Sequence, residues 1–398
     1  MALMLEPDLV LADEPTTALD ATLEVEILDL LRRLQAETHC SVIFVTHHLG
    51  VVASLCDRVL VMNGGDIKEA GEVSTVFANP ADDYTRMLLR CDPARIVEPT
   101  RRLPTMADNL DTAVTIHRGP ADRVKETDAP VLDIENLSVS FRRSSSLPTW
   151  LGGQTQIIEA VRDVSLKVRK GETVALVGES GSGKTTIARS VLGLVRPVAG
   201  SIAVCGKPVD AQDAESLRRA RARTAMMFQD PTGSLSPRVT LGEQVVEPLI
   251  VQGVKDVDLK ARAAELLSQV GLGPDFAGRY PHQLSGGQAR RVGVARAVVL
   301  EPDLIIADEP TAGLDVSIQG DVLNLLNEIQ ERTGVSILII THNMSVVRHC
   351  ADRLIVLLRG EIVEAGPCAD IFSNPANPYT TALIAASQHQ LPEHSEQD

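Results

Sequence analysis

The sequence predicts an α/β protein with a mostly parallel core sheet, in which one complete domain follows a partial copy of itself. Residues 173–192 read as an apolar strand, a glycine-rich loop and a helix, in that order. Residues 5–20 match residues 300–315 at an offset of 295, and the match continues without a gap. Self-similarity of this kind indicates an internal duplication.

The duplication sets the expected domain boundaries. We expect a partial first copy over residues 1–91 and a complete copy over residues 130–386. Residues 92–129 mix proline, charge and small polar residues with neither helical nor strand period, which predicts a linker. The polar residues 387–398 are expected to be disordered.

Within the complete copy, alternation from Val131 onward predicts a half-buried strand with a hairpin neighbour at residues 161–168. A one-sided apolar pattern over residues 259–270 predicts a helix. We also expect the strand at residues 304–307, and by analogy residues 9–12 of the first copy, to lie beside the strand that enters the glycine-rich loop.

The glycine-rich loop, G-E-S-G-S-G-K-T, has the pattern of a phosphate-binding loop. Glycines let backbone N–H groups approach phosphates, and the following helix N-terminus adds partial positive charge. We expect Lys184 to reach the β- and γ-phosphates and the Thr185 hydroxyl to ligate Mg²⁺. The expected nucleotide-contacting residues of this loop are Gly178, Glu179, Ser180, Gly181, Ser182, Gly183, Lys184, Thr185 and Thr186.

The apolar run at residues 304–307 ends in Asp308 and Glu309, as expected of a buried parallel strand that delivers carboxylates at its C-terminal edge. The pair alone would indicate an ordinary acidic turn, but D-E-P-T-A-G-L-D behind a phosphate loop favours a catalytic role. Asp308 is expected to hold the Mg²⁺ shell, and Glu309 to polarise an attacking water.

Between these motifs lies L-S-G-G-Q, and with it the sequence resembles the ATP-binding cassette (ABC) family. A serine that caps a helix is the simpler interpretation of this turn. The resemblance instead implies that the turn contacts the γ-phosphate of ATP held by an opposite cassette, through Ser285, Gly286, Gly287 and Gln288. It also implies that Gln229 lies in the loop between the subdomains and ligates Mg²⁺, that His342 contacts the γ-phosphate, that Asp315 lies where cassettes cross, and that Phe141 stacks on adenine.

The subfamily follows from F-Q-D-P-T-G-S-L-S-P-R and from the tails F-A-N-P-A-D-D-Y-T and F-S-N-P-A-N-P-Y-T, which look like those of importer ATPases for dipeptides, oligopeptides and nickel. The resemblance implies an ATPase that powers uptake and lies peripherally at the cytoplasmic face of the inner membrane. Its implied partners are permease subunits, a solute-binding protein reached through them, and a second cassette. In such importers the solute is chosen by the binding protein and the permease.

Composition excludes several other classes of protein. The chain has 398 residues, 44% of them hydrophobic, and no apolar run approaches the roughly 18 residues of a membrane span. No secretory signal is visible at the start of the sequence. A net charge of −15 opposes binding to nucleic acid. Six cysteines without a C-x-x-C pair predict neither a zinc site nor a disulfide framework.

The first copy keeps Asp13, Glu14, Asp20 and His47, but the sequence starts after the point where its phosphate loop and L-S-G-G-Q turn would stand. We expect neither intramolecular ATP site to be complete. Three explanations are open: Met1 is internal to a longer or broken reading frame, complete cassettes of two chains pair in trans, or the protein binds ATP without productive turnover. An uncovered apolar face should leave residues 1–90 marginally stable.

Overall fold

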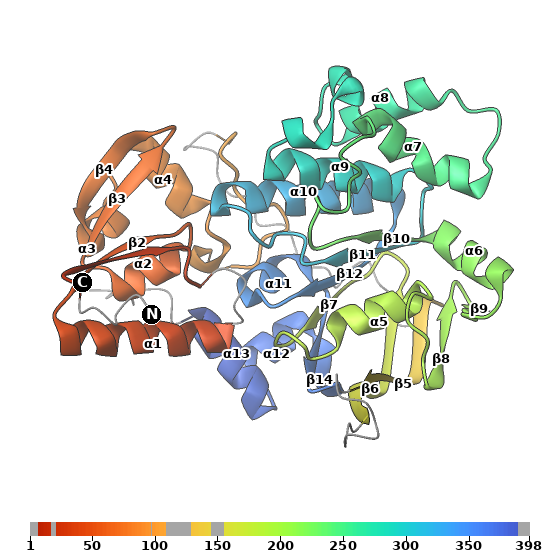
Figure 1. The fold of residues 1–398 in the computed structure, drawn as a ribbon, viewed down its shortest axis with the longest axis horizontal. Helices are drawn as coiled ribbons and strands as arrows, with labels where there is room; N and C mark the ends of the chain where they lie inside the picture. Colours follow the sequence, from red (N-terminus) through yellow and green to blue (C-terminus); the bar gives the residue numbers. More distant parts are fainter. Residues whose placement is uncertain (1–6, 17–20, 97, 109–128, 145–154, 389–398) are drawn as a thin grey trace.

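The computed structural model describes residues 7–16, 21–96, 98–108, 129–144 and 155–388. The duplication is visible as two lobes, with the first copy on the left of Figure 1 and the complete second copy on the right. Both expected strands of the hairpin, the strand before the glycine-rich loop and the helix at residues 259–269 are present. Across these ranges we find no helix whose length and apolarity would carry it through a bilayer.

The second copy is built on a six-stranded sheet in the order β10-β11-β12-β7-β13-β14, parallel except for β14. The core strands are β7 (Thr173–Val177), β10 (Thr224–Met227), β11 (Leu304–Asp308), β12 (Ser336–Thr341), β13 (Arg353–Leu358) and β14 (Glu361–Pro367). The helices are α5 (Lys184–Val191), α6 (Ala214–Arg223), α7 (Leu241–Gln252), α8 (Leu259–Gln269), α9 (Gly286–Val298), α10 (Val316–Thr333), α11 (Met344–Cys350), α12 (Cys368–Ser373) and α13 (Pro378–Gln388), with short 3-10 helices η5 (Pro274–Gly278) and η6 (Pro281–Gln283).

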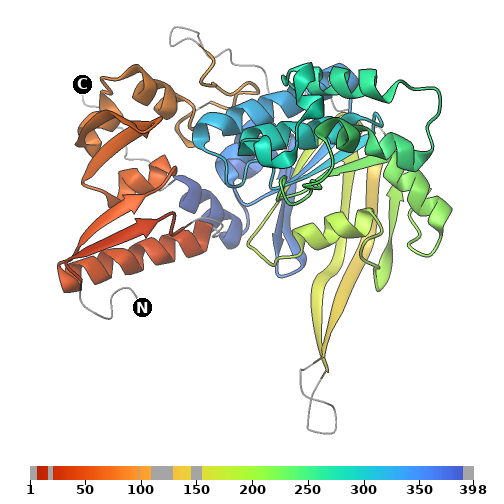
Figure 2. The same cartoon turned by 45° about the horizontal axis from the view of Figure 1, so that its top comes forward.

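A second, antiparallel sheet in the order β6-β5-β8-β9 covers one face of the core sheet. Its strands are β5 (Pro130–Ser144), β6 (Thr155–Arg169), β8 (Ala199–Val204) and β9 (Lys207–Pro208). The β5–β6 ribbon extends well away from the body of the molecule (Figure 2). Helices α9 and α10 pack on the opposite face of the core sheet, because alternate residues of each buried strand point to opposite sides.

The strand order corrects one expectation. Strand β11 does not lie beside β7, since β12 pairs with both and separates them. Neighbours along the chain and neighbours in a parallel sheet differ whenever helical crossovers reorder the strands. The strands that flank β7 are β12 and β13.

The first copy repeats this architecture in part. Its elements are β1 (Leu9–Asp13), α1 (Ala21–Thr38), β2 (Ser41–Val45), α2 (Leu49–Leu55), β3 (Arg58–Asn63), β4 (Asp66–Glu72), α3 (Val73–Ala78) and α4 (Asp83–Arg90). The β3–β4 hairpin shifts register between Val61 and Met62, and β13–β14 shifts at the equivalent Val356 and Leu357. Among the described residues, β2 and β3 belong to separate two-stranded sheets. In the second copy, β7 pairs with both of their counterparts, β12 and β13.

Residues 92–108, hereafter the connector, form the first part of the expected linker. They include the short 3-10 helix η2 (Pro93–Arg95), and Thr100, Leu103 and Thr105 are buried. The connector is therefore packed against the protein at these three residues. Residues 109–128 and 389–398 lie outside the described part of the chain, while α13 continues to Gln388, inside the expected tail.

Candidate nucleotide site

The glycine-rich loop turns sharply between β7 and α5. Gly178 and Gly183 have φ angles of 149° and 110°, and an added Cβ would lie 2.0 Å from the Leu357 carbonyl oxygen and 2.4 Å from the Ala160 carbonyl oxygen. Side chains at these two positions are therefore excluded by both conformation and space. The turn carries its backbone N–H groups to the N-terminus of α5, where an anion is favoured.

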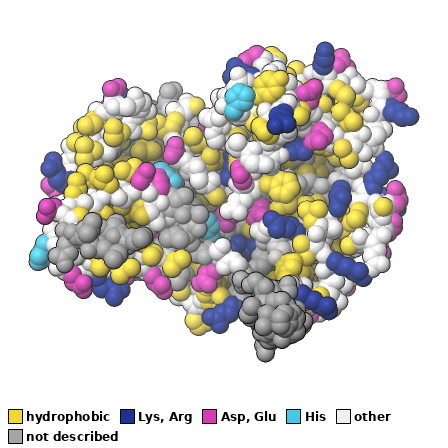
Figure 3. All heavy atoms as spheres, viewed as in Figure 1, with side chains coloured by type: hydrophobic (Ala, Val, Ile, Leu, Met, Phe, Trp, Pro, Cys, Tyr) yellow, Lys and Arg dark blue, Asp and Glu magenta, His cyan; other side chains and the backbone are white. Residues whose placement is uncertain are grey.

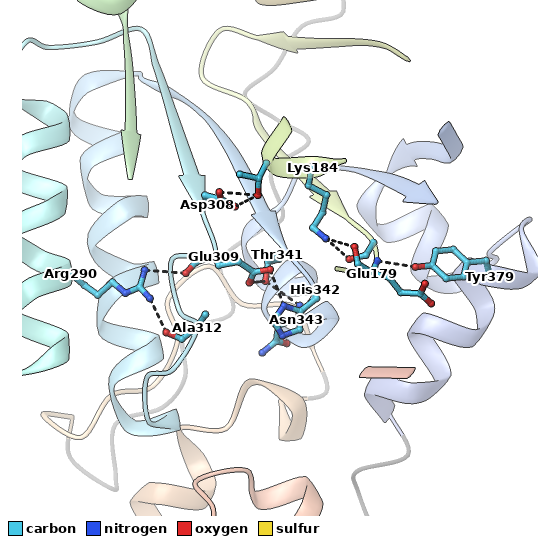
Figure 4. Close-up of polar contacts among 12 residues, drawn as sticks. Glu179, Lys184, Arg290, Asp308, Glu309, Ala312, Thr341, His342, Asn343 and Tyr379 are labelled. Atoms are coloured by element: carbon cyan, nitrogen blue, oxygen red, sulfur yellow. Dashed lines mark hydrogen bonds and ion pairs between the residues drawn. The ribbon is translucent and has the colours of Figure 1, made fainter. Parts of the chain in front are cut away.

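Lys184, the first residue of α5, holds the loop together from inside. Its Nζ donates to the carbonyl oxygens of Gly178 at 2.6 Å and Glu179 at 2.8 Å (Figure 4). The buried ammonium group is thereby positioned among the loop residues, where a phosphate would compete for its protons.

Two oxygen groups predicted to bind a cation, one on α5 and one at the end of β11, are in contact. The Thr185 hydroxyl donates to Asp308 Oδ2 at 3.1 Å. Burial raises the pKa of the Asp308 carboxyl, an effect offset in part by the Thr185 hydrogen bond. A hydroxyl and a carboxylate fit Mg²⁺, which prefers oxygen ligands and keeps other positions for water and phosphate.

The carboxylate of Glu309 is oriented by two neighbours on β12 and the loop after it. Its Oε1 lies 2.8 Å from His342 Nδ1, and its Oε2 accepts from the Thr341 hydroxyl at 3.1 Å (Figure 4). Glu309 also has a φ of 49°, a left-handed conformation that costs a non-glycine residue about 1–3 kcal/mol. Strain and hydrogen bonds together indicate a carboxylate held in one direction.

These groups line one cavity of about 560 Å³. The cavity contains the predicted residues Ser180, Gly181, Gly183, Lys184, Thr185, Thr186, Gln229, Asp308, Glu309 and His342. Gln229 is exposed at this cavity. Gly178, Glu179 and Ser182 shape the loop without lining the cavity.

Arg290 and Tyr379 form hydrogen bonds to backbone atoms of the site, and the sequence analysis did not predict either residue. Arg290, buried on α9, donates to the carbonyl oxygens of Glu309 at 3.1 Å and Ala312 at 2.8 Å. The Tyr379 hydroxyl on α13 accepts from the Glu179 backbone N–H at 3.0 Å (Figure 4). Both residues bond to backbone atoms, so no pair of side-chain types in the sequence indicates their roles. The signals that could have found them were the two arginines after L-S-G-G-Q and the Y-T tail that both copies share.

Comparison with known proteins agrees with this geometry. The family model described as ABC transporter matches residues 161–312. The model described as oligopeptide/dipeptide transporter, C-terminal region, matches residues 69–120 and 363–396, once in each copy. A solved structure of the ATP-binding cassette MJ0796 bound to ADP and Pi is 30% identical, with a TM-score of 0.53, and the match covers 60% of this chain and 98% of that one. The chain belongs to the ABC transporter family.

Curated relatives from this family match almost the whole chain. The glutathione import ATP-binding protein GsiA of Pectobacterium atrosepticum is 43% identical over 389 residues, and that of Escherichia coli K12 is 43% identical over 392 residues. Each match covers 97% of this chain and 62% of the relative, so the chain spans less than two thirds of their length. The structure of CbiO1 from Clostridium perfringens, part of the ABC transporter complex cbiONQ, is 27% identical with a TM-score of 0.52, and covers 62% of this chain and 91% of that one.

The remaining ABC-type residues lie apart from the cavity. Ser285 caps α9, and its Oγ accepts from the Gln288 N–H at 3.3 Å, so the helix-cap interpretation holds alongside any second role. Gly286 is exposed and Gly287 is buried beside Ile318. Phe141 lies on the β5–β6 ribbon, opposite Ile158, and is 42% exposed; it does not line the cavity. Asp315 is the N-cap residue of α10. Burial, and to a smaller extent the charge of Asp315, raises the pKa of Tyr84 in the first copy.

The first copy reproduces half of the catalytic arrangement. His47 Nδ1 lies 2.7 Å from Glu14 Oε1, and Glu14 has a φ of 45°. Both residues line the same cavity as the phosphate loop of the second copy. Asp13 is exposed, unlike its buried counterpart Asp308, and Asp20 lies outside the described residues.

We expect Tyr379→Phe to weaken ATP binding by about 2- to 10-fold, because one neutral hydrogen bond contributes roughly 0.5–1.5 kcal/mol to the shape of the loop. The dissociation constant from equilibrium titration checks this. Tyr84→Phe, the equivalent change in the first copy, is the control and should leave affinity unchanged. Equal affinities for wild type and Tyr379→Phe would show that the loop keeps its shape without this bond.

Proposed function

We propose that this chain is the ATP-binding and ATP-hydrolysing subunit of a membrane importer for peptides or related small solutes. The observation that carries the proposal is the cavity in which Lys184, the Thr185–Asp308 pair and the Glu309–His342 pair converge. Phosphoryl transfer demands neutralised phosphate charge and an aligned water, with little covalent work for the protein. These residues supply both requirements.

Each residue has a distinct role in the proposed reaction. Lys184 and the loop N–H groups bind the phosphates, and Glu309, held by Thr341 and His342, orients the water. Thr185, Asp308 and Gln229 would hold Mg²⁺, which supplies charge neutralisation when bound. The outward-facing turn at Ser285 would contact ATP held by another cassette, so we propose that turnover depends on association between cassettes.

A groove of about 320 Å³ between β10, α7 and α9 supports a permease partner. Its lining includes Phe228, 44% exposed, together with Pro248 and Arg296. Arg290 also donates to the Phe228 carbonyl oxygen at 3.4 Å, which links the groove to the backbone of Glu309. We propose that a permease helix docks in this groove at the inner face of the membrane, where its position affects the ATP site.

The solute class is proposed from the relatives. These relatives are named glutathione import ATP-binding proteins, and glutathione is a tripeptide. The C-terminal region of oligopeptide/dipeptide transporters matches twice. A permease and a solute-binding protein would select the solute, so the chain itself contributes the energy source.

We expect Mg-ATP to bind with one equivalent per chain, because the described residues contain one phosphate loop. Lys184→Ala should weaken binding about 10- to 100-fold, since hydrogen bonds to charged groups contribute roughly 1.5–3 kcal/mol. Isothermal titration measures both quantities, and Lys167→Ala, at an exposed lysine paired with Asp133, is the matched control. Two equivalents per chain, or unchanged binding in Lys184→Ala, contradict the proposal; binding without hydrolysis favours the non-transport alternative.

A further inference from the structure

The connector is held along one face of α10 in the second copy. Gly320, Asn324, Asn327 and Gln330 recur at helical spacing and are buried beneath it. Asn324 makes two bonds to Leu103: its Oδ1 accepts from the Leu103 N–H at 2.8 Å, and its Nδ2 donates to the Leu103 carbonyl oxygen at 2.8 Å. A side-chain amide thus pairs with the connector backbone as a neighbouring strand would.

Further bonds extend the contact toward the C-terminal end of α10. Asn327 Nδ2 donates to the Arg101 carbonyl oxygen at 2.7 Å, and Arg101 Nη2 donates to Gln330 Oε1 at 2.6 Å. Leu103 is 2% exposed and joins the main apolar core of the second copy. The connector is therefore held both by hydrogen bonds to its backbone and by burial of the Leu103 side chain.

Helix α11 also contacts the connector, through His349. Its Nδ1 accepts from the Thr100 N–H at 3.1 Å, and its Nε2 lies 2.9 Å from the Pro93 carbonyl oxygen. One neutral tautomer satisfies both contacts, with the proton on Nε2. Burial lowers the pKa of His349, which favours that neutral form.

Gly320 lets the connector backbone approach α10 closely, so α10 and α11 together form a groove that fits this backbone. A Cβ at this position would lie 2.8 Å from the Pro104 carbonyl oxygen and 3.4 Å from Leu103 Cβ, so only glycine allows the approach. The equivalent position of the first copy is Val25. The equivalents of Asn324 and Asn327 are Asp29 and Arg32, which form a half-exposed ion pair at 3.0 Å. The groove chemistry is thus specific to the second copy.

The same elements reach the nucleotide cavity. Pro93 and Ala94 of the connector, Val316 and Gln319 of α10, and Met344 and Ser345 of α11 all line it. The connector also holds the first copy, because the Arg95 guanidinium stacks 5.7 Å above the Phe77 ring. A ligand that fills the cavity contacts the connector and both walls of its groove at once.

We propose that α10 and α11 form a docking groove for an extended peptide, that the connector is its resident ligand, and that nucleotide in the cavity tightens this docking. The coupling between nucleotide and connector docking rests on the proposed function. Bound nucleotide stabilises the docked state of the connector, because it contacts the connector and both helices in that state. By linkage, docking of the connector raises the affinity for nucleotide. The two copies are thereby held together through a contact that responds to ATP.

Hydrogen exchange of peptides covering residues 98–105, in the full chain, tests the groove. Asn324→Leu removes both bonds to Leu103 and should speed exchange roughly 10- to 100-fold, with new tryptic cleavage after Arg101 and Arg102. Gly320→Val blocks the approach by a different route, and Asp29→Leu on α1 is the matched control. A synthetic peptide of residues 98–108 should bind the Leu103→Asp chain, whose own connector is released, and should not bind wild type.

The outcomes separate the parts of the proposal. If Asn324→Leu retains its unfolding temperature and ATP binding, and residues 98–105 exchange as in wild type, the docking groove is refuted. A non-hydrolysable ATP analogue should slow this exchange about 5- to 150-fold in wild type. An analogue that binds without slowing exchange overturns the coupling and leaves the proposed function intact. Failure of the analogue to bind instead contradicts the proposed function, while the Asn324→Leu comparison without nucleotide still decides the groove.

Discussion

Glu309→Gln is expected to lower ATP hydrolysis by roughly 10²- to 10³-fold, because a group aligned on the reacting atoms contributes that much in comparable sites. Glutamine keeps the size of the side chain and its bond from Thr341, but it lacks the negative charge that polarises water. ATP affinity should stay near that of wild type, since Lys184 and the loop bind the phosphates. Phosphate release under single-turnover conditions measures the loss.

Glu14→Gln is the matched control, because Glu14 shares the left-handed φ, the histidine partner and the cavity of Glu309. Only Glu309 follows an aspartate that is bonded to the phosphate-loop threonine. We therefore expect Glu14→Gln to change the rate little. An equal loss in both variants would show that the first copy takes part in catalysis. Specific activity that rises with protein concentration would support the trans contact of Ser285.

The chemistry of the cavity was predictable because it depends on residue types at fixed spacing. The phosphate loop needs glycine at Gly178 and Gly183, and the acidic pair must follow a buried strand, so both left clear patterns in the sequence. Thr185 and Asp308 are 123 positions apart, and their 3.1 Å contact confirms that the two motifs meet. The resemblance added the histidine that contacts Glu309.

Residues that act on backbone atoms were less visible. Arg290 and Tyr379 bind carbonyl and N–H groups, which every residue carries, so their partners leave no pattern. The packing of the connector could not be predicted for the same reason: an extended segment bonded by side-chain amides has no period of its own. Its signal lay on the partner helix, where Gly320, Asn324, Asn327 and Gln330 place small and amide residues on one face.

The duplication also explains why the first copy differs in packing despite its similar sequence. Leu9, Leu11, Ile43 and Val45 are between 49% and 72% exposed, whereas the equivalents Leu304, Ile306, Leu338 and Ile340 are fully buried. In the second copy α5 and the antiparallel sheet cover this face. Figure 3 shows hydrophobic side chains gathered over the first copy. We expect limited proteolysis to cut within residues 7–90 before it cuts the second copy.

A lysine introduced at equivalent positions of the two copies should therefore change stability by very different amounts. Ile306→Lys places an unpaired ammonium group in a fully buried site, and it should destabilise the second copy by about 4–5 kcal/mol or more. Leu11→Lys, at a side chain that is 72% exposed, should change stability by no more than about 0.5 kcal/mol.

Leu11→Lys should also reduce self-association, because a charge opposes pairing of exposed apolar strands. Urea unfolding measures the stability of both variants, and sedimentation velocity measures their association. If Leu11→Lys is as destabilising as Ile306→Lys, the first copy's apolar face is covered in solution, and the two copies then differ less in packing than their exposures indicate.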